Sequence, residues 1–258
     1  MGIYTNRVGE EKYNKQGNLM KIIEYNNSMD VFVEFQDEYK ATIHTTYDNF
    51  LKGSIKNPYY KSVFEVGIIG SKYSTWINNK HTKEYGTWCR MLERCYSKKL
   101  KEKRPTYENV TCCNEWMLFE NFYEWLHSQS NFNKWISEKD SAIDKDILIK
   151  GNKIYSPNTC CLVPKNINSL FVKCNATRGD LPIGVSKCGN LFRVKCQNPF
   201  KNKCEYLGDY HTLEEAFEVY KQYKESIIKQ VAKEEYNKGN ITKRCYEAMI
   251  NYKVEITD

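Results

Sequence analysis

The stretch Leu191-Phe-Arg-Val-Lys-Cys-Gln197 decides the fold of the C-terminal part of the chain. Successive side chains of a β-strand point to opposite faces, so the apolar residues of this stretch share one face and the polar residues share the other. The apolar set is Phe192, Val194 and Cys196, and the polar set is Arg193, Lys195 and Gln197. We expect the apolar set to pack on a helix. The polar set would face a partner or, as often on a free antiparallel face, only water.

The residues on either side of this strand predict the rest of a small sheet and its supporting helix. Leu181–Val185 opens the domain, and Lys203–Leu207 is a further strand after a turn at Asn198–Asn202. Thr212-Leu-Glu-Glu215 is a capping box, so a helix is expected to begin there. Its apolar residues recur at helical spacing, and a short helix over 242–252 closes the chain.

Several motifs of this C-terminal segment point to a known family. They are Gly184-Val185, Phe192-Arg-Val-Lys195, Tyr206-Leu-Gly-Asp-Tyr210 and Thr212-Leu-Glu-Glu-Ala-Phe-Glu-Val-Tyr220. The segment resembles the DNA-binding domain of plant Apetala/ethylene-response factors and its phage relatives, although its strands hold fewer arginines than those of the plant members. The resemblance implies a three-stranded antiparallel sheet packed on a helix, with the outer sheet face on double-stranded DNA. It places Arg193, Lys195 and Tyr206 at base- or backbone-contacting positions, with Lys187, Asn190 and Gln197 as neighbours.

The centre of the chain changes to helical periodicity and then returns to strands. One stripe, over 84–97, is Trp88, Met91, Leu92 and Cys95; a second, after the N-cap Asn114, is Trp116, Phe119, Tyr123 and Leu126. Both stripes are expected to lie in the core. A strand over Ala142–Ile149, a turn at Lys150–Asn152, an extended Ser156–Asn158 and a helix over Asn166–Phe171 follow.

The central motifs also point to a family. They are Tyr85–Tyr96, Val110–Trp116, Asn121–Trp125, Ile143–Asp146 and Tyr155–Cys160. Together they resemble a group of phage HNH-type endonucleases, in which a β-hairpin and a helix hold one divalent metal ion and a hairpin residue activates water. The resemblance implies Asp144, Lys145 and Asp146 as catalytic residues. Asp144 and Asn168 would be the ligands of Mg²⁺ or Mn²⁺, which prefer oxygen donors.

The hairpin departs from the HNH pattern at the general base. The four histidines are His44, His81, His127 and His211, and none lies in the hairpin or its helix. Lys145 stands where the histidine is expected, but a lysine flanked by two carboxylates stays protonated and suits a phosphate charge better than a proton. Asp146 or a metal-bound hydroxide is then the candidate base. Alternatively, the two carboxylates only pair with Lys145.

The N-terminal residues predict a small β module. Strands are expected over 20–25, 31–35 and 39–47, and Gly53 with Asn57-Pro58 ends the run. These strands suggest a small curled sheet or an SH3-like barrel. Gly9–Gly17 and Asp30–Asp37 resemble β modules that accompany phage nucleases, with either a DNA-gripping or a supporting role.

Charge and cysteine content narrow the class of partner. The 258 residues carry a net charge of +7, and the segment Arg90–Arg104 holds seven basic residues against Glu93 and Glu102. Such a segment attracts phosphate, or is simply a solvated helix end. Eleven cysteines occur without a CxxC pair. Cys112-Cys113 and Cys160-Cys161, with Cys95, could hold a structural Zn²⁺, but buried thiols are the default interpretation.

These patterns predict an α+β chain of three parts. The parts are 1–70, a small β-barrel-like module; 71–178, an HNH-like ββα-metal domain; and 179–258, the Apetala/ethylene-response-factor-like domain with a C-terminal helix. The expected protein is a sequence-recognising, metal-dependent DNA endonuclease of phage or prophage origin, similar to homing endonucleases. Two alternatives stay open: a catalytically inactive, regulatory DNA-binding protein on an HNH-derived scaffold, and an interaction protein that inhibits a host factor. With no apolar run of about 18 residues and no signal-peptide pattern, we expect a cytoplasmic protein of the bacterial host cell, without a membrane partner.

Overall fold

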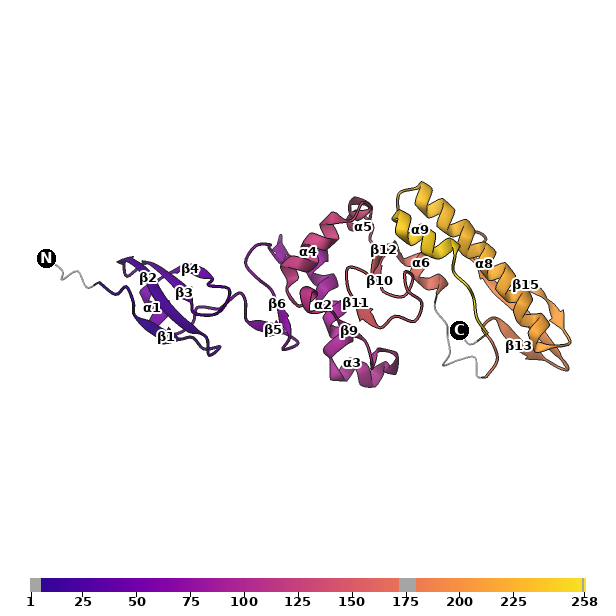
Figure 1. Cartoon of the computed structure of the whole chain (residues 1–258), viewed down its shortest axis with the longest axis horizontal. Coiled ribbons are helices and arrows are strands. Elements are labelled where there is room, and N and C mark those ends of the chain that lie inside the picture. Colours follow the sequence, from indigo (N-terminus) through magenta and orange to yellow (C-terminus); the bar gives the residue numbers. More distant parts are fainter. Residues whose placement is uncertain (1–5, 172–179, 257) are drawn as a thin grey trace. The chain divides into compact units, whose positions relative to one another are not determined.

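The computed structural model describes residues 6–171, 180–256 and 258 (Figure 1). The chain divides into two compact units, Met1–Glu108 with Cys112–Glu124, and Asn109–Thr111 with Trp125–Asp258. Helices and several small sheets alternate along both, which makes the chain an α+β protein.

The N-terminal strands form an open four-stranded sheet in the order β1-β2-β3-β4. The strands are β1 (Glu11–Tyr13), β2 (Leu19–Asn27), β3 (Asp30–Phe35) and β4 (Thr42–Thr45). All pairs are antiparallel, and no pairing between the described residues joins β1 to β4. Of the two forms expected for this module, the SH3-like barrel is therefore wrong, whereas a small open sheet is present.

A short helix occupies the place where the third predicted strand was expected to continue. After β4 the Thr46 side chain accepts a hydrogen bond from the Asn49 backbone N–H and starts α1 (Tyr47–Leu51). Phe50 of α1 is buried in the same core as Val31 and Val33 of β3. A helix therefore covers this core, and the edge strands stay short.

The rest of the first unit is small hairpins and helices. Its elements are β5 (Lys61–Val63), β6 (Gly67–Ile68), β7 (Trp76–Ile77), β8 (Lys80–His81), α2 (Lys83–Tyr96), α3 (Lys98–Lys103) and η1 (Pro105–Tyr107). The four apolar residues predicted for the α2 stripe, from Trp88 to Cys95, are at most 1% exposed, which confirms that prediction. The Trp88 indole donates a hydrogen bond to the Trp116 carbonyl oxygen at 2.7 Å.

The second predicted helix is divided in two. Following β9 (Thr111–Cys112), η2 (Asn114–Met117) and α4 (Phe119–Ser128) are separated by Leu118, whose backbone is extended at φ −90° and ψ 119°. The break changes the helical phase, so Phe122 is fully buried where Tyr123 was expected to be.

In the second unit a strand pair precedes a short helix, in the order that the sequence predicted. After α5 (Phe132–Ser137) the elements are β10 (Ser141–Asp144), β11 (Ile154–Tyr155), β12 (Cys161–Pro164) and α6 (Lys165–Leu170). β10 pairs antiparallel with β12. The strand that was predicted to reach Ile149 ends at Asp144.

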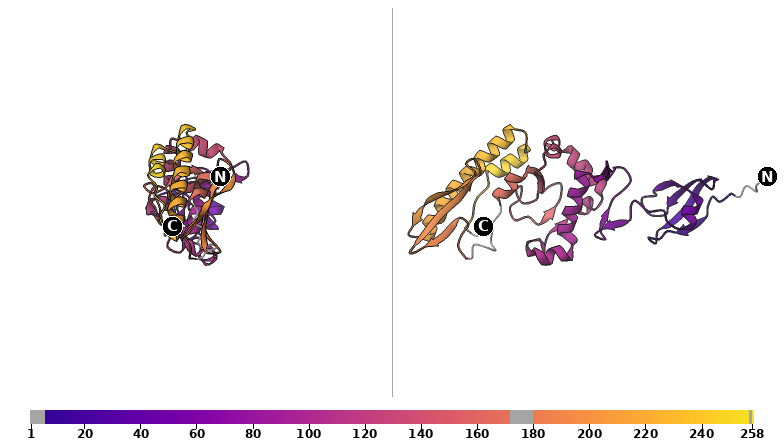
Figure 2. Two further views of the ribbon diagram at one scale, coloured as in Figure 1. Left: turned by 90° about the vertical axis from the view of Figure 1, so that its right-hand side faces the viewer. Right: turned by 180° about the vertical axis from the view of Figure 1, so that it is seen from behind.

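The C-terminal sheet lies against one long helix (Figures 1 and 2). The sheet order is β13 (Val185–Cys188), β14 (Leu191–Asn198) and β15 (Lys203–Tyr210), all antiparallel. The capping box at Thr212 and Glu215 is formed and begins α8 (Leu213–Asn237), and α9 (Lys243–Ile250) follows. One core joins Val163 and Ile167 to Val194 and Tyr220, so β12 and α6 share their apolar interior with this sheet and helix.

Candidate nucleic-acid interface

The strand β14 separates its side chains between two environments. Val194 and Cys196 are buried in the core that α8 lines, and Phe192 packs against that core. Lys195 and Gln197 are exposed on the opposite face, as the alternation predicts. Among the described residues, no carboxylate forms an ion pair with Lys195. The outer sheet face therefore offers an ammonium group and a carboxamide to a partner.

Arg193 also lies on the outer face, but its charge is already matched. Its Nε and Nη2 donate hydrogen bonds to the two carboxylate oxygens of Asp209, both at 2.9 Å. This two-pronged pair holds the pKa of Asp209 below its ordinary value. The Arg193 Cζ lies 5.6 Å from the centroid of the Tyr206 ring. The Arg193 guanidinium keeps three N–H groups that can donate to a partner. The charges of Arg193 and Asp209 cancel, so the pair has no net charge.

A β-bulge brings Tyr206 and Asp209 onto the same face. Val194 pairs with Gly208 and Lys195 pairs with Tyr206, so Leu207 is the extra residue of β15. Without the extra residue, strand positions three apart would point to opposite faces. Gly208 has φ +133°, and a Cβ there would lie 2.8 Å from the Tyr210 hydroxyl, so the bulge needs glycine.

The sheet register sorts the other predicted DNA contacts. Tyr206 is 58% exposed and lies opposite Lys195 on the outer face. Lys187 pairs with Phe192, so it lies on the face that packs on α8, whereas it was expected beside Arg193. Asn190 is exposed in the turn before β14.

Sequence reasoning assigned no role to Asp209, the residue that most changes this face. Asp209 lies within the motif Tyr206-Leu-Gly-Asp-Tyr210, but only the bulged register shows that it meets Arg193. An acidic residue three positions after an exposed Tyr206, with glycine between them, is the signal that could have suggested it.

The side chains predicted for catalysis form hydrogen bonds with the backbone of the loop that follows β10. The Asp144 Oδ1 atom accepts hydrogen bonds from the backbone N–H groups of Asp146 (2.7 Å) and Ile147 (2.8 Å). Burial raises the pKa of Asp144, and the two N–H groups partly oppose this. Lys145 is buried, pairs with Asp146 and donates to the Asn152 carbonyl oxygen at 2.8 Å. One alternative was that the two carboxylates only pair with Lys145. The ion pair between Lys145 and Asp146 supports this alternative for Asp146.

Few side-chain oxygens remain near this loop to hold a metal ion. Asp144 keeps its Oδ2 without a hydrogen bond to a described residue, and Asn168 lies half-buried on α6, which packs on β10. Magnesium accepts one or two protein oxygens with several waters. Nowhere in the described ranges do three His, Cys, Asp or Glu side chains group as a metal site would require. Burial raises the pKa of Cys113, and that of Cys160 to about 12, which disfavours the free thiolate of both cysteines.

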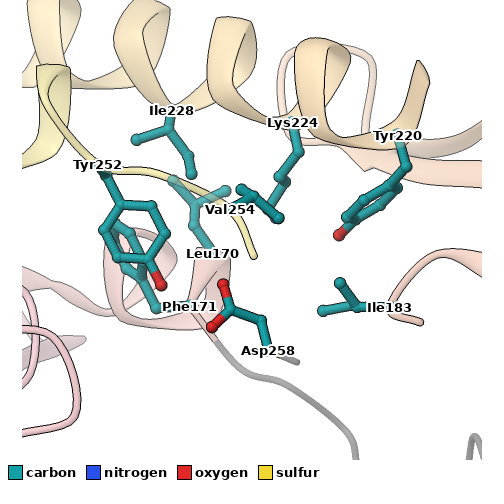
Figure 3. A pocket seen from close by; sticks show the side chains of 9 residues that line it. All are labelled: Leu170, Phe171, Ile183, Tyr220, Lys224, Ile228, Tyr252, Val254 and Asp258. Carbon is teal, nitrogen blue, oxygen red and sulfur yellow. The ribbon is translucent and has the colours of Figure 1, made fainter. Parts of the chain in front are cut away.

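A small cavity of about 20 Å³ lies under α8 in the second unit (Figure 3). Tyr220, Lys224 and Ile228 reach it from α8, and Asp258 lies across from them. Lys224 is 9% exposed, and burial lowers its pKa. This volume holds one water molecule, so we assign the cavity no organic ligand.

Comparison with known proteins identifies no relative: no family model matches the chain, and neither a curated protein nor a solved structure is detectably similar to it. No helix in the described part of the chain combines the length and hydropathy that a bilayer crossing needs.

Proposed function

We propose that this protein binds double-stranded DNA through the outer face of the sheet β13-β14-β15. The observation that carries the proposal is the sorting of β14, which turns Lys195 and Gln197 outward while Val194 and Cys196 are buried against α8. Lysine pairs with guanine and glutamine with adenine in the major groove. Tyr206, opposite Lys195 and 58% exposed, adds a hydroxyl-bearing side chain that suits a phosphate oxygen.

The side-chain geometry favours base reading over charge attraction on this face. Because Asp209 neutralises Arg193, the net charge of Arg193, Lys195 and Asp209 together is +1. Phosphate contacts carry little sequence information, whereas directed donors and acceptors do. We therefore expect this face to contribute more to sequence preference than to total affinity.

The test is a selection from random duplexes, followed by anisotropy measurements with the selected and an unrelated duplex. We expect Lys195→Ala with Gln197→Ala to reduce the preference for the selected duplex by about 10-fold or more, because each good base contact discriminates by about 1–3 kcal/mol. Lys229→Ala, an exposed lysine of α8, makes the matched change of charge. An unchanged preference in the double variant would reject the sheet face as the reader.

A second candidate function is metal-dependent cleavage of the DNA backbone. Asp144 ends β10 and Asn168 lies on the adjoining α6, and neither side-chain oxygen that would meet an ion, Asp144 Oδ2 or Asn168 Oδ1, has a described hydrogen-bond partner. A bound divalent ion would supply Lewis-acid activation of a phosphate. Lys145 is fixed by Asp146 and Asn152 and would hold positive charge beside such an ion.

Nicking of supercoiled plasmid with Mg²⁺ or Mn²⁺ tests this second function. Asp144→Asn keeps the oxygen that accepts the two backbone N–H groups but removes the charge, so its fold is retained and cleavage is expected to fall at least 100-fold. Cleavage that survives both Asp144→Asn and Asn168→Ala would place any nuclease activity elsewhere.

A further inference from the structure

The net charge of the chain is concentrated in one short segment of the first unit. Arg90–Arg104 holds seven basic and two acidic residues, a net +5, whereas the remaining residues hold 32 basic and 30 acidic residues, a net +2. We call Arg90–Arg104 the basic segment. A cluster of like charges repels itself, so a protein that keeps one on its surface gains from a polyanionic partner.

Local structure turns the charges of the basic segment toward solvent. One side of α2 is buried and carries Trp88, Met91 and Leu92, whereas Arg90 is exposed on another side of this helix. Ser97 ends α2 and also caps α3, because its hydroxyl accepts a hydrogen bond from the Leu100 backbone N–H at 3.3 Å. No residue of α3 is buried, and four of its six residues are lysines.

Five exposed cations of the segment have no ionic partner within the described ranges. They are Arg90, Lys98, Lys99, Lys103 and Arg104, all exposed. Elsewhere many surface cations are matched, as Lys52 is by Asp48, Lys201 by Glu205 and Arg193 by Asp209. Exposed cations without an ion pair to a described residue also occur elsewhere, as Lys195 and Lys229 do, but in the basic segment five of them fall within fifteen residues that hold only two acids.

The surroundings of these cations favour one class of polyanion. The large hydrophobic side chains exposed elsewhere in the described residues are absent from 90–104. A protein interface or a membrane-inserting helix needs such apolar anchors. Single-stranded nucleic acid is held by exposed stacking rings, whereas Tyr96 is half-buried here. The remaining fit is the phosphate backbone of a duplex, which presents charge without requiring apolar contact.

We infer that the basic segment is the main phosphate-binding surface of this protein and contacts the backbone of double-stranded DNA without reading its sequence. The inference rests on the proposed DNA binding but assigns the affinity to a second surface, in the other compact unit from the sheet. Lys98, Lys99 and Lys103 of α3 would each neutralise a phosphate and release its counterions.

The experiment measures the affinity of the full chain for duplex DNA from about 50 to 200 mM salt. The variant is Lys98→Ala with Lys99→Ala and Lys103→Ala. Three lost phosphate contacts should reduce the magnitude of the slope of log K against log [salt] by about 2.7. From about 50 to 200 mM salt, the factor by which the variant loses affinity should therefore be about 40 times smaller than the factor for the wild type. The loss at low salt should be equal for selected and unrelated duplexes. The control removes three exposed lysines of the second unit, Lys139→Ala with Lys229→Ala and Lys233→Ala.

The outcomes separate this inference from the proposed function. If the wild type binds duplex DNA but the α3 variant has the slope of the control, the inference fails and the sheet proposal stands. If the wild type binds no duplex at low salt, both fail. Tighter binding of the wild type to single-stranded DNA or to anionic phosphatidylserine vesicles than to the duplex would also overturn the inference. If the circular dichroism spectrum of the variant equals that of the wild type, a smaller salt slope is not caused by unfolding.

Discussion

Removing the acid that holds Arg193 should strengthen DNA binding. Asp209→Asn keeps the size of the side chain but removes the charge that now meets the guanidinium at two 2.9 Å contacts. The outer-face charges of Arg193, Lys195 and Asp209 then change from +1 to +2. Arg193→Ala should have the opposite effect, because it leaves Asp209 without its partner on the proposed DNA-binding face and reduces the total to zero.

The magnitude follows from counting charges. One added phosphate contact makes the slope of log K against log [salt] steeper by about 0.9. Removing a negative charge about 7 Å from a phosphate adds roughly threefold in affinity if the gap is filled with water. The expected order of affinity is therefore Asp209→Asn above the wild type, and the wild type above Arg193→Ala. The double variant Arg193→Ala with Asp209→Asn has a total of +1, so it should return to the slope of the wild type.

Fluorescence anisotropy of a labelled duplex in a salt series measures all four proteins. Glu214→Gln, an exposed acid at the start of α8, changes the net charge by the same amount away from the sheet. Because Arg193 keeps the pKa of Asp209 below its ordinary value, the wild type should not acquire the behaviour of Asp209→Asn on acidification to pH 4, where an ordinary aspartate is about half protonated. If Asp209→Asn binds DNA no more tightly than Glu214→Gln, the charge-matching argument is refuted.

Two further predictions concern the fold behind the sheet. Lys224→Met should raise the free energy of unfolding by roughly 1–3 kcal/mol at pH 7, because it removes a buried ammonium without a described partner. Because burial lowers the pKa of Lys224, the unfolded chain binds the proton more tightly than the folded chain. The stability advantage of Lys224→Met should therefore shrink as pH rises toward about 10.4. If urea unfolding shows an advantage that does not change with pH, this prediction is wrong. Gly184→Ala should lower the urea midpoint by an amount equivalent to about 2–4 kcal/mol, because φ is +77° and the new Cβ would lie 2.1 Å from the Tyr220 ring. Gly189→Ala, with φ +59° and no atom within 4 Å, is its control, and an equal loss in both variants would show that the contact with Tyr220 is not the cause.

Patterns that depend on one element could be read from the sequence. The α2 stripe from Trp88 to Cys95, the capping box at Thr212 and the alternation of β14 each follow from the period of a single helix or strand. These features fix which residues enter the core, and the structure reproduces them.

Features that depend on a second element or on a side chain bonded to the backbone could not be read in the same way. Asp144 ends its strand because its carboxylate binds two backbone N–H groups, an alternative that competes with the ladder. Lys187 changes face because its pairing partner is Phe192, and Asp209 reaches Arg193 only through the bulge at Leu207. The candidate site therefore differs from the prediction where register decides the neighbours.

The two proposed surfaces make different demands on the energetics of recognition. A face on which Asp209 cancels Arg193 contributes little attraction to arbitrary DNA, so binding at the sheet alone would be weak at physiological salt. The unmatched cations of the basic segment would supply that attraction equally to every duplex. Substitutions in α3 should then lower the affinities for selected and unrelated duplexes by the same factor and leave their ratio unchanged. Substitutions at Lys195 and Gln197 should lower the ratio while most of the affinity remains. If the α3 variant changed the ratio as strongly as the sheet variant does, affinity and selectivity would not be divided between the two surfaces.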